Sequence, residues 1–216
     1  YGSMKQKIES AGDSLPLMNN AFKNLLVSAR DLRKNPRPGS KTMDNKTRQE
    51  MEAFIRSLGV GSIGYTKVNP DHIFDGFEIL HENAIAITME MDREIVKTSP
   101  SKEFANEIYR TYDELGIAVN KIADWLRERG YSCHASPAIG GDVNTVPVAQ
   151  DAGLGCVGKN GILVTPEYGP CVRLAAVFVE IEDLPLNTSN EHLWIRDFCE
   201  TCNRCIKQCP ADAVYE

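Results

Sequence analysis

The longest regular pattern of apolar and polar positions lies in residues 104–126. Apolar side chains recur there every three or four residues, which is typical of one buried face of a long helix; they are Phe104, Ile108, Tyr112, Leu115, Val119, Ile122 and Leu126. We expect Ser99 to cap this helix, Pro100 to occupy its first turn and Gly130 to end it. The same period over residues 44–58 predicts a second, shorter amphipathic helix.

Four apolar runs predict strands. Residues 83–91 alternate in part, and residues 172–179 are almost continuously apolar, as expected of a strand covered on both faces. Residues 61–67 and 131–135 predict two shorter strands. Because helices and strands alternate along the chain, we expect an α/β (α+β) layer architecture over about residues 44–186.

Composition divides the chain into three regions. Its 216 residues suffice for one or two domains. Residues 1–43 are polar and basic, and we expect a tag remnant at residues 1–3 and then a basic arm, either solvated or bound to an anionic partner. Residues 44–187 hold the predicted layers. A polar hinge at residues 187–190 then leads into a cysteine-rich region, residues 188–216.

Charge and hydropathy exclude some classes of protein. No apolar run approaches the roughly 18 residues that a membrane span needs. The net charge of −6 argues against nucleic acid as the main partner. The chain shows no twin-arginine or Sec-type leader, and its odd number of cysteines suits reduced thiols, so we expect a cytoplasmic protein.

The strongest motif is a run of four cysteines. Cys199, Cys202, Cys205 and Cys209 have spacings of two, two and three residues, and a proline follows the last. This is the bacterial [4Fe–4S] ferredoxin spacing, in which short gaps wrap a loop around the cluster. Zinc is the alternative metal, although zinc ligands usually form two separated pairs. In two-cluster ferredoxins the fourth cysteine ligates the other cluster. Either all four cysteines here hold one cluster or, as we expect, this region is the first half of a truncated module.

A glycine-rich stretch precedes the last predicted strand. Residues 152–170 read AGLGCVGKNGILVTPEYGP, and glycines allow the backbone to approach a ligand closely. The stretch is not a Walker loop, because Asn160 stands where Ser or Thr is required. It matches G-x-G-x-x-G only formally, since no clear strand comes directly before it. On composition alone it is a ligand-binding loop.

Together, the glycine-rich stretch and the cysteine motif resemble the corrinoid (cobalamin)-dependent reductive dehalogenases. The related epoxyqueuosine reductases share the Gly-Leu-Gly-x-x-Gly-Lys portion. The resemblance covers roughly residues 45–216. It implies a nitroreductase-like core over residues 44–187 that binds cobalamin, beside a ferredoxin-like segment that supplies electrons. The implied corrinoid contacts are Asn144, Gly153, Leu154, Gly155, Gly158, Lys159, Asn160, Thr165, Pro166, Glu167 and Tyr168.

The resemblance also implies a proton donor and an assisting cation. Dehalogenases use a tyrosine, which counting back from Gly130 places at Tyr112, with Tyr109 as second choice; the alternative is that Tyr112 is only a core residue of its helix. A phenol titrates near ~10, so it needs a neighbouring cation to release its proton. Arg173 is the candidate, although Cys171 replaces an arginine that the dehalogenases commonly have, and Arg173 could instead be a solvated strand residue.

Three further residues have side chains that could take part in catalysis or metal binding, namely Asp142, Cys156 and His134. Asp142 lacks the sequence context of the catalytic aspartate in epoxyqueuosine reductases, so we interpret it as a loop residue. Cys156 is interpreted as a small buried hydrophobe. His134 could approach cobalt, but a structural histidine is the commoner role.

The function expected is a cobalamin-dependent, iron–sulfur oxidoreductase that reductively cleaves a carbon–halogen or carbon–oxygen bond. Its expected partners are a small organohalide or similar substrate and an electron donor such as ferredoxin or flavodoxin. One alternative is a non-catalytic protein that binds or reactivates corrinoids by electron transfer. A weaker one is a plain ferredoxin with an appended domain.

Overall fold

The computed structural model describes residues 14–209 and 211–215, so the expected tag remnant and Pro210 lie outside the described residues. Its centre is a four-stranded antiparallel sheet in the order β1-β2-β6-β3. The strands are β1 (Ile63–Lys67), β2 (Asn83–Glu90), β3 (Cys133–Ser136) and β6 (Val172–Val179). All four lie within about two residues of the runs that predicted them, and the two longest, β2 and β6, are the central pair.

One face of the sheet is covered by α5 (Lys102–Glu128) and α3 (Asn45–Ser57). The apolar stripe of α5 supplies four fully buried side chains to this core, namely Leu115, Val119, Ile122 and Leu126. Alternate residues of β6, such as Ala175 and Val177, meet them from the sheet. Both predicted helices are confirmed, and Gly130 follows α5 with a φ of +85°.

The predicted start of α5 was wrong by two residues. Ser101, not Ser99, is the N-cap, and its side chain accepts a hydrogen bond from the backbone N–H of Phe104 at 3.0 Å. Pro100 lies before the cap. A serine hydroxyl stood at both positions, so the local sequence did not distinguish them.

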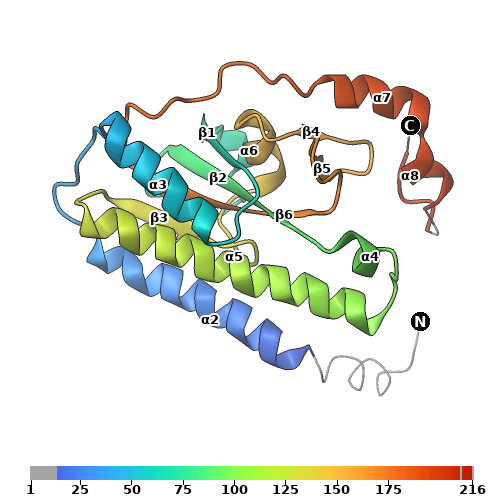
Figure 1. Ribbon diagram of the computed structural model, residues 1–216, viewed down its shortest axis with the longest axis horizontal. Helices are drawn as coiled ribbons and strands as arrows, with labels where there is room; N and C mark the ends of the chain where they lie inside the picture. Colours follow the sequence, from blue (N-terminus) through green and yellow to red (C-terminus); the bar gives the residue numbers. More distant parts are fainter. Residues whose placement is uncertain (1–13, 210, 216) are drawn as a thin grey trace.

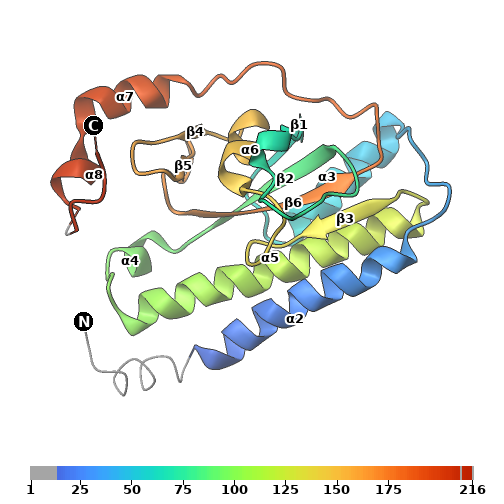
Figure 2. The same ribbon diagram turned by 180° about the vertical axis from the view of Figure 1, so that it is seen from behind.

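The opposite face of the sheet is covered by α6 (Thr145–Asp151) and by the short hairpin of β4 (Cys156–Val157) and β5 (Leu163–Val164). Two 3-10 turns, η1 (Leu32–Lys34) and η2 (Pro70–His72), and the short helix α4 (Arg93–Val96) complete the connections. The hairpin and α4 lie at the same end of the molecule as the C-terminal helices α7 (Trp194–Cys202) and α8 (Arg204–Lys207) (Figures 1 and 2).

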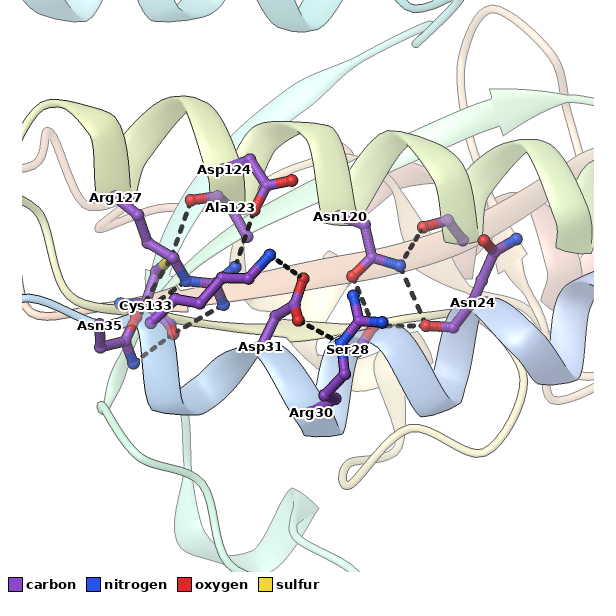
Figure 3. Close-up of polar contacts among 12 residues, drawn as sticks. Asn24, Ser28, Arg30, Asp31, Asn35, Asn120, Ala123, Asp124, Arg127 and Cys133 are labelled. Atoms are coloured by element: carbon purple, nitrogen blue, oxygen red, sulfur yellow. Dashed lines mark hydrogen bonds and ion pairs between the residues drawn. The ribbon is translucent and has the colours of Figure 1, made fainter.

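The basic region is not a solvated arm over its described part. Residues Leu15–Asp31 form α2, which packs along α5 and buries Ala21, Ser28 and Asp31. Buried polar contacts join the two helices (Figure 3): Asn120 of α5 accepts from the Ser28 hydroxyl at 2.9 Å and donates to the Asn24 carbonyl at 3.0 Å. Because this interface is polar, the apolar periodicity that reveals other helices is weak here.

The polar linker at residues 187–190 is fixed to the core. The side-chain amide of Asn187 donates to the carbonyl of Asp151, and that of Asn190 donates to the carbonyls of Gln150 and Gly155. The linker therefore anchors the cysteine region to the end of α6 and does not have the form of a free hinge. Among the described residues, no helix has both the length and the apolarity needed to cross a bilayer.

Candidate functional site

A cavity of about 390 Å³ lies where α5 extends past the sheet, between the start of β6 and the β4–β5 hairpin. Its volume is within the range of small-molecule sites. Its lining is mainly apolar, with Met91 after β2, Val96 in α4 and Phe104 in α5. Tyr112, Thr145, Asn160 and Arg173 are the polar and charged residues among those that form its walls. No Asp or Glu occurs among the described residues that line it.

Tyr112 and Arg173 meet in the wall of this cavity. The guanidinium carbon of Arg173 lies 4.8 Å from the centroid of the Tyr112 ring, a cation–π distance. Arg173 is in β6 and points to the α5 side of the sheet, because it shares that face with Ala175 and Val177. Its Nε atom is buried and has no hydrogen-bond partner among the described residues. A buried donor left in this way favours an acceptor inside the cavity.

The neighbouring tyrosine is placed differently. The ring of Tyr109 lies 6.4 Å from that of Tyr112, but Tyr109 is not among the residues that line the cavity. Of the two tyrosines that the sequence offered as proton donor, the structure brings Tyr112 to both the cavity and the cation. Whether Tyr112 donates a proton stays a prediction.

A second cavity of about 290 Å³ adjoins the first and shares Ala138 and Thr145 with it. Gly140, Gly141 and Asn144 contribute to its walls. Asn144 is also the N-cap of α6, since its side-chain oxygen accepts from the N–H of Val146 at 3.2 Å. The two cavities therefore share part of their walls, and each is lined by apolar side chains with a few polar groups.

Most residues of the glycine-rich stretch pack against neighbouring backbone or core side chains, and few of them line the cavity. Gly153 ends α6 with a φ of +78°, and a Cβ on Gly155 would collide with the carbonyl oxygen of Val164. Leu154 is buried in the core on the α6 side of the sheet. Of the contacts predicted within residues 152–163, Asn160 lines the first cavity. Ile162 and Leu163 line it too, although they were not among the predicted contacts.

Residues 165–169, which form a turn, are not among the described residues that line the cavity. Thr165 and Gly169 exchange two backbone hydrogen bonds of 2.9 Å, and the Thr165 hydroxyl accepts from the N–H of Tyr168. Pro166 and Glu167 are exposed at the tip of this turn. None of the four predicted contacts from this turn lines the cavity, so their role toward a corrinoid stays a prediction.

The cysteine segment, defined as residues 199–209, carries four free, partly exposed thiols on α7, α8 and the chain that follows. Asn203 has a left-handed φ of 47° and reverses the chain between the two helices. The N–H of Ala213 donates to the Cys209 sulfur at 3.3 Å and lowers the pKa of this thiol. Four thiols at this spacing are the donor set that an iron–sulfur cluster requires.

The four sulfurs are not gathered around one point. Among the described residues, no three His, Cys, Asp or Glu side chains lie close enough together to hold a metal ion. The donor chemistry therefore fits a cluster, whereas its ligation by Cys199, Cys202, Cys205 and Cys209 stays a prediction.

Lys159 and Gly158 link the hairpin to the cysteine segment. Lys159 Nζ lies 2.8 Å from a carboxylate oxygen of Glu200 and donates to Asn203 Oδ1 at 3.1 Å. A Cβ on Gly158 would lie 3.7 Å from the Cys199 sulfur. The loop that forms one cavity wall is thus in contact with the thiol-bearing helix.

Three of the residues considered as candidates in the sequence, His134, Asp142 and Cys156, are not among the described residues that line either cavity. His134 packs edge-on against Phe178 and lies 3.2 Å from the carboxylate of Asp142, an arrangement typical of a structural histidine. Asp142 is in the loop before α6, and Cys156 is fully buried. Cys171, by contrast, lines the cavity beside Val172.

Comparison with known proteins gives relatives by sequence. No protein-family model matches the chain. A tetrachloroethene reductive dehalogenase of Desulfitobacterium hafniense is 35% identical over 167 residues, which cover 76% of this chain and 29% of the relative. An epoxyqueuosine reductase of Gloeobacter violaceus is 33% identical over 103 residues, covering 47% and 30% respectively. The chain therefore spans less than a third of the length of these relatives.

Solved structures give the same fold. A catabolic reductive dehalogenase in complex with 3-bromo-4-hydroxybenzoic acid matches 90% of this chain and 30% of its own, with a TM-score of 0.71 and 19% identity. A reductive dehalogenase whose structure suggests a mechanism for B12-dependent dehalogenation matches 82% of this chain and 26% of its own (TM-score 0.70, 21% identity). An epoxyqueuosine reductase with a modified tRNA stem loop matches 78% and 53% (TM-score 0.59, 21% identity). The predicted fold class is confirmed, whereas the exclusion of nucleic acid as a partner stays a prediction.

Proposed function

Because this chain is a homologue of the reductive dehalogenases and the epoxyqueuosine reductases, as its glycine-rich stretch and cysteine motif indicated, we propose that it forms part of a cobalamin- and iron–sulfur-dependent oxidoreductase. The reaction proposed is reductive cleavage of a carbon–halogen bond in a small organohalide. The observation that carries the proposal is the pairing of Tyr112 with Arg173 in a cavity whose loop contacts the cysteine segment.

Such a reaction consumes two electrons and one proton for each bond broken. The carbon–halogen bond breaks, halide leaves, and a carbon–hydrogen bond forms with the added proton. A corrinoid, when bound, supplies the low-potential two-electron chemistry at the carbon–halogen bond. It would contact Asn160 in the first cavity and Asn144 in the second. The four thiols of the cysteine segment would hold the cluster that receives electrons from a ferredoxin or flavodoxin.

Tyr112 is the residue proposed to deliver the proton. Tyr112 lines the cavity, and its phenolic hydroxyl is a group that can donate a proton to a substrate bound there. Arg173 is proposed to stabilise the phenolate that remains, because a guanidinium over the ring lowers the energy of the anionic form.

Tyr112→Phe in the full-length protein tests the proposal. The protein is purified without oxygen, loaded with hydroxocobalamin and iron–sulfur cluster, and supplied with a reductant and brominated or chlorinated phenols. Halide release should fall by about a hundredfold or more, the usual contribution of a positioned proton donor. Tyr109→Phe is the matched control and should retain activity, because Tyr109 does not line the cavity. Full activity of Tyr112→Phe would refute the assignment.

A non-catalytic role in corrinoid binding or reactivation is the second candidate. The observation that favours it is Cys171, which lines the cavity where the dehalogenases commonly have an arginine. Such a protein would bind hydroxocobalamin and pass electrons to it without releasing halide from any halogenated phenol. If the same protein instead consumed an epoxyqueuosine RNA fragment, the bond cleaved would be carbon–oxygen.

A further inference from the structure

The side chain of Lys159 connects two parts of the chain that are far apart in sequence. It leaves the β4–β5 hairpin and ends between Glu200 and Asn203 of the cysteine segment, with nitrogen–oxygen distances of 2.8 and 3.1 Å. Only 17% of this lysine side chain is exposed, whereas the Glu200 side chain is 62% exposed. A lysine that is this well covered holds its partners more firmly than an ordinary surface ion pair does.

Both partners of Lys159 stand between cysteines. Glu200 follows Cys199, and Asn203 occupies the left-handed turn between Cys202 and Cys205. The Asn203 amide also donates to the carbonyl of Glu200 at 3.2 Å, which ties the two acceptors together. Holding this pair therefore fixes the turn between α7 and α8, the two helices that carry Cys199, Cys202 and Cys205.

The hairpin end of the same contact belongs to the cavity wall. Gly158 donates its N–H to the carbonyl of Ile162 at 3.0 Å, which closes the loop that carries Lys159. Asn160 and Ile162 of this loop line the cavity. At Gly158 the loop backbone also passes close to the Cys199 sulfur. One short loop, residues 158–162, therefore lines the cavity with Asn160 and Ile162 and contacts the cysteine segment through Lys159.

We propose that Lys159 is a positioning residue that docks the cysteine segment against the cavity loop, and that it does not serve as a contact to the cofactor. In the proposed function, this contact fixes the distance between the cluster and the cavity, so the consequence for electron transfer rests on that function. The docking itself does not rest on it, because every contact named here is made within the chain.

Hydrogen exchange followed by mass spectrometry tests the docking. Lys159→Met should speed amide exchange in peptides that cover α7 and α8 by about five- to twentyfold, while peptides from α5 remain unchanged. Lys207→Met is the matched control, because Lys207 is an exposed lysine on α8 itself, and it should change this exchange by less than about twofold. An unchanged rate in Lys159→Met would overturn the proposal.

A charge exchange sharpens this test. Lys159→Glu alone places two carboxylates together and should speed exchange in α7 and α8 further, whereas combining it with Glu200→Lys should recover at least part of the protection. Equal exchange in the single and double variants would show that the ion pair does not hold the segment.

Absorbance titration with hydroxocobalamin separates docking from cofactor binding. If Lys159 only positions the cysteine segment, Lys159→Met should bind hydroxocobalamin within about twofold of the unaltered protein. A loss of tenfold or more would assign Lys159 to the cofactor and overturn the proposal. If the unaltered protein does not bind hydroxocobalamin at all, the proposed function fails, and the exchange experiment still decides the docking.

Discussion

The buried polar network between α2 and α5 allows a quantitative test of the fold (Figure 3). The side-chain amide of Asn120 donates to the carbonyls of Asn24 and Gly116, at 3.0 and 2.9 Å, and its oxygen accepts from the Ser28 hydroxyl at 2.9 Å. Ser28 is 2% exposed and Asn120 is 8% exposed, so water cannot replace a missing partner. We expect Asn120→Ala and Ser28→Ala each to lower the free energy of unfolding.

The expected loss of unfolding free energy depends on how many hydrogen bonds each variant removes and how many buried partners it leaves unpaired. Asn120→Ala removes three hydrogen bonds and should cost about 2–3 kcal/mol. Ser28→Ala should cost about 1 kcal/mol, because it removes one donor to Asn120. The double variant should be less unstable than the sum by about 1 kcal/mol, since the bond between the two side chains can be lost only once.

Denaturant unfolding followed by circular dichroism measures these values. Asn19→Ala is the control, because Asn19 is an exposed asparagine on α2, and it should change the free energy of unfolding by about 0.5 kcal/mol or less. If both buried variants behaved like this control and were additive, α2 would not pack on α5 as described. The outcome matters for the site, because α5 also carries Tyr112.

Three further outcomes are expected. Gly155→Ala should lower the free energy of unfolding by about 1–3 kcal/mol in the same assay, since its Cβ would collide with the carbonyl of Val164; an unchanged midpoint would contradict the hairpin. The pKa of the buried Asp31 carboxyl is lowered, chiefly by its hydrogen bond to Arg30, so this group stabilises the fold above the unfolded pKa near ~4 and the stabilisation is lost as the pH falls. The stability difference between the unaltered protein and Asp31→Asn should therefore be larger at about pH 6 than at about pH 2, and a constant difference would refute the pairing. Burial raises the pKa of Cys133 to about 12, so in the native, cluster-free protein iodoacetamide should modify the thiols of the cysteine segment well before Cys133, as peptide mass spectrometry would show.

Much of the fold could be predicted from the sequence because its main elements bury apolar side chains. The stripe of α5 and the apolar run of β6 have the period and the length of the elements that form. The helix α2 was missed for the opposite reason, since its buried contacts with α5 are made by Ser28 and Asn24. Such polar pairs exist only once the two helices are side by side, and no local pattern marks them.

The site was predictable to a lesser degree. Tyr112 and Arg173 were expected from the resemblance to the dehalogenases, and the structure places both in the cavity wall, whereas their chemical roles stay predictions. The glycine-rich stretch was harder to interpret, because glycine is needed equally where backbones approach each other and where a backbone approaches a ligand. Gly155 packs against the backbone of β5, whereas Gly158 lies beside the cysteine segment.

The cavity itself arises from a mismatch in length between two elements that share one core. The 27 residues of α5 extend about 40 Å, whereas the eight residues of β6 extend only about 27 Å. The helix therefore continues beyond the sheet toward α4 (Figure 1). Its C-terminal half covers the sheet, and its N-terminal half carries the same apolar face past the start of β6 and toward α4. Phe104 and Tyr112 consequently line a hollow, and Arg173, at the start of β6, stands at its edge. One unbroken stripe thus forms core along one half of the helix and the wall of the cavity along the other.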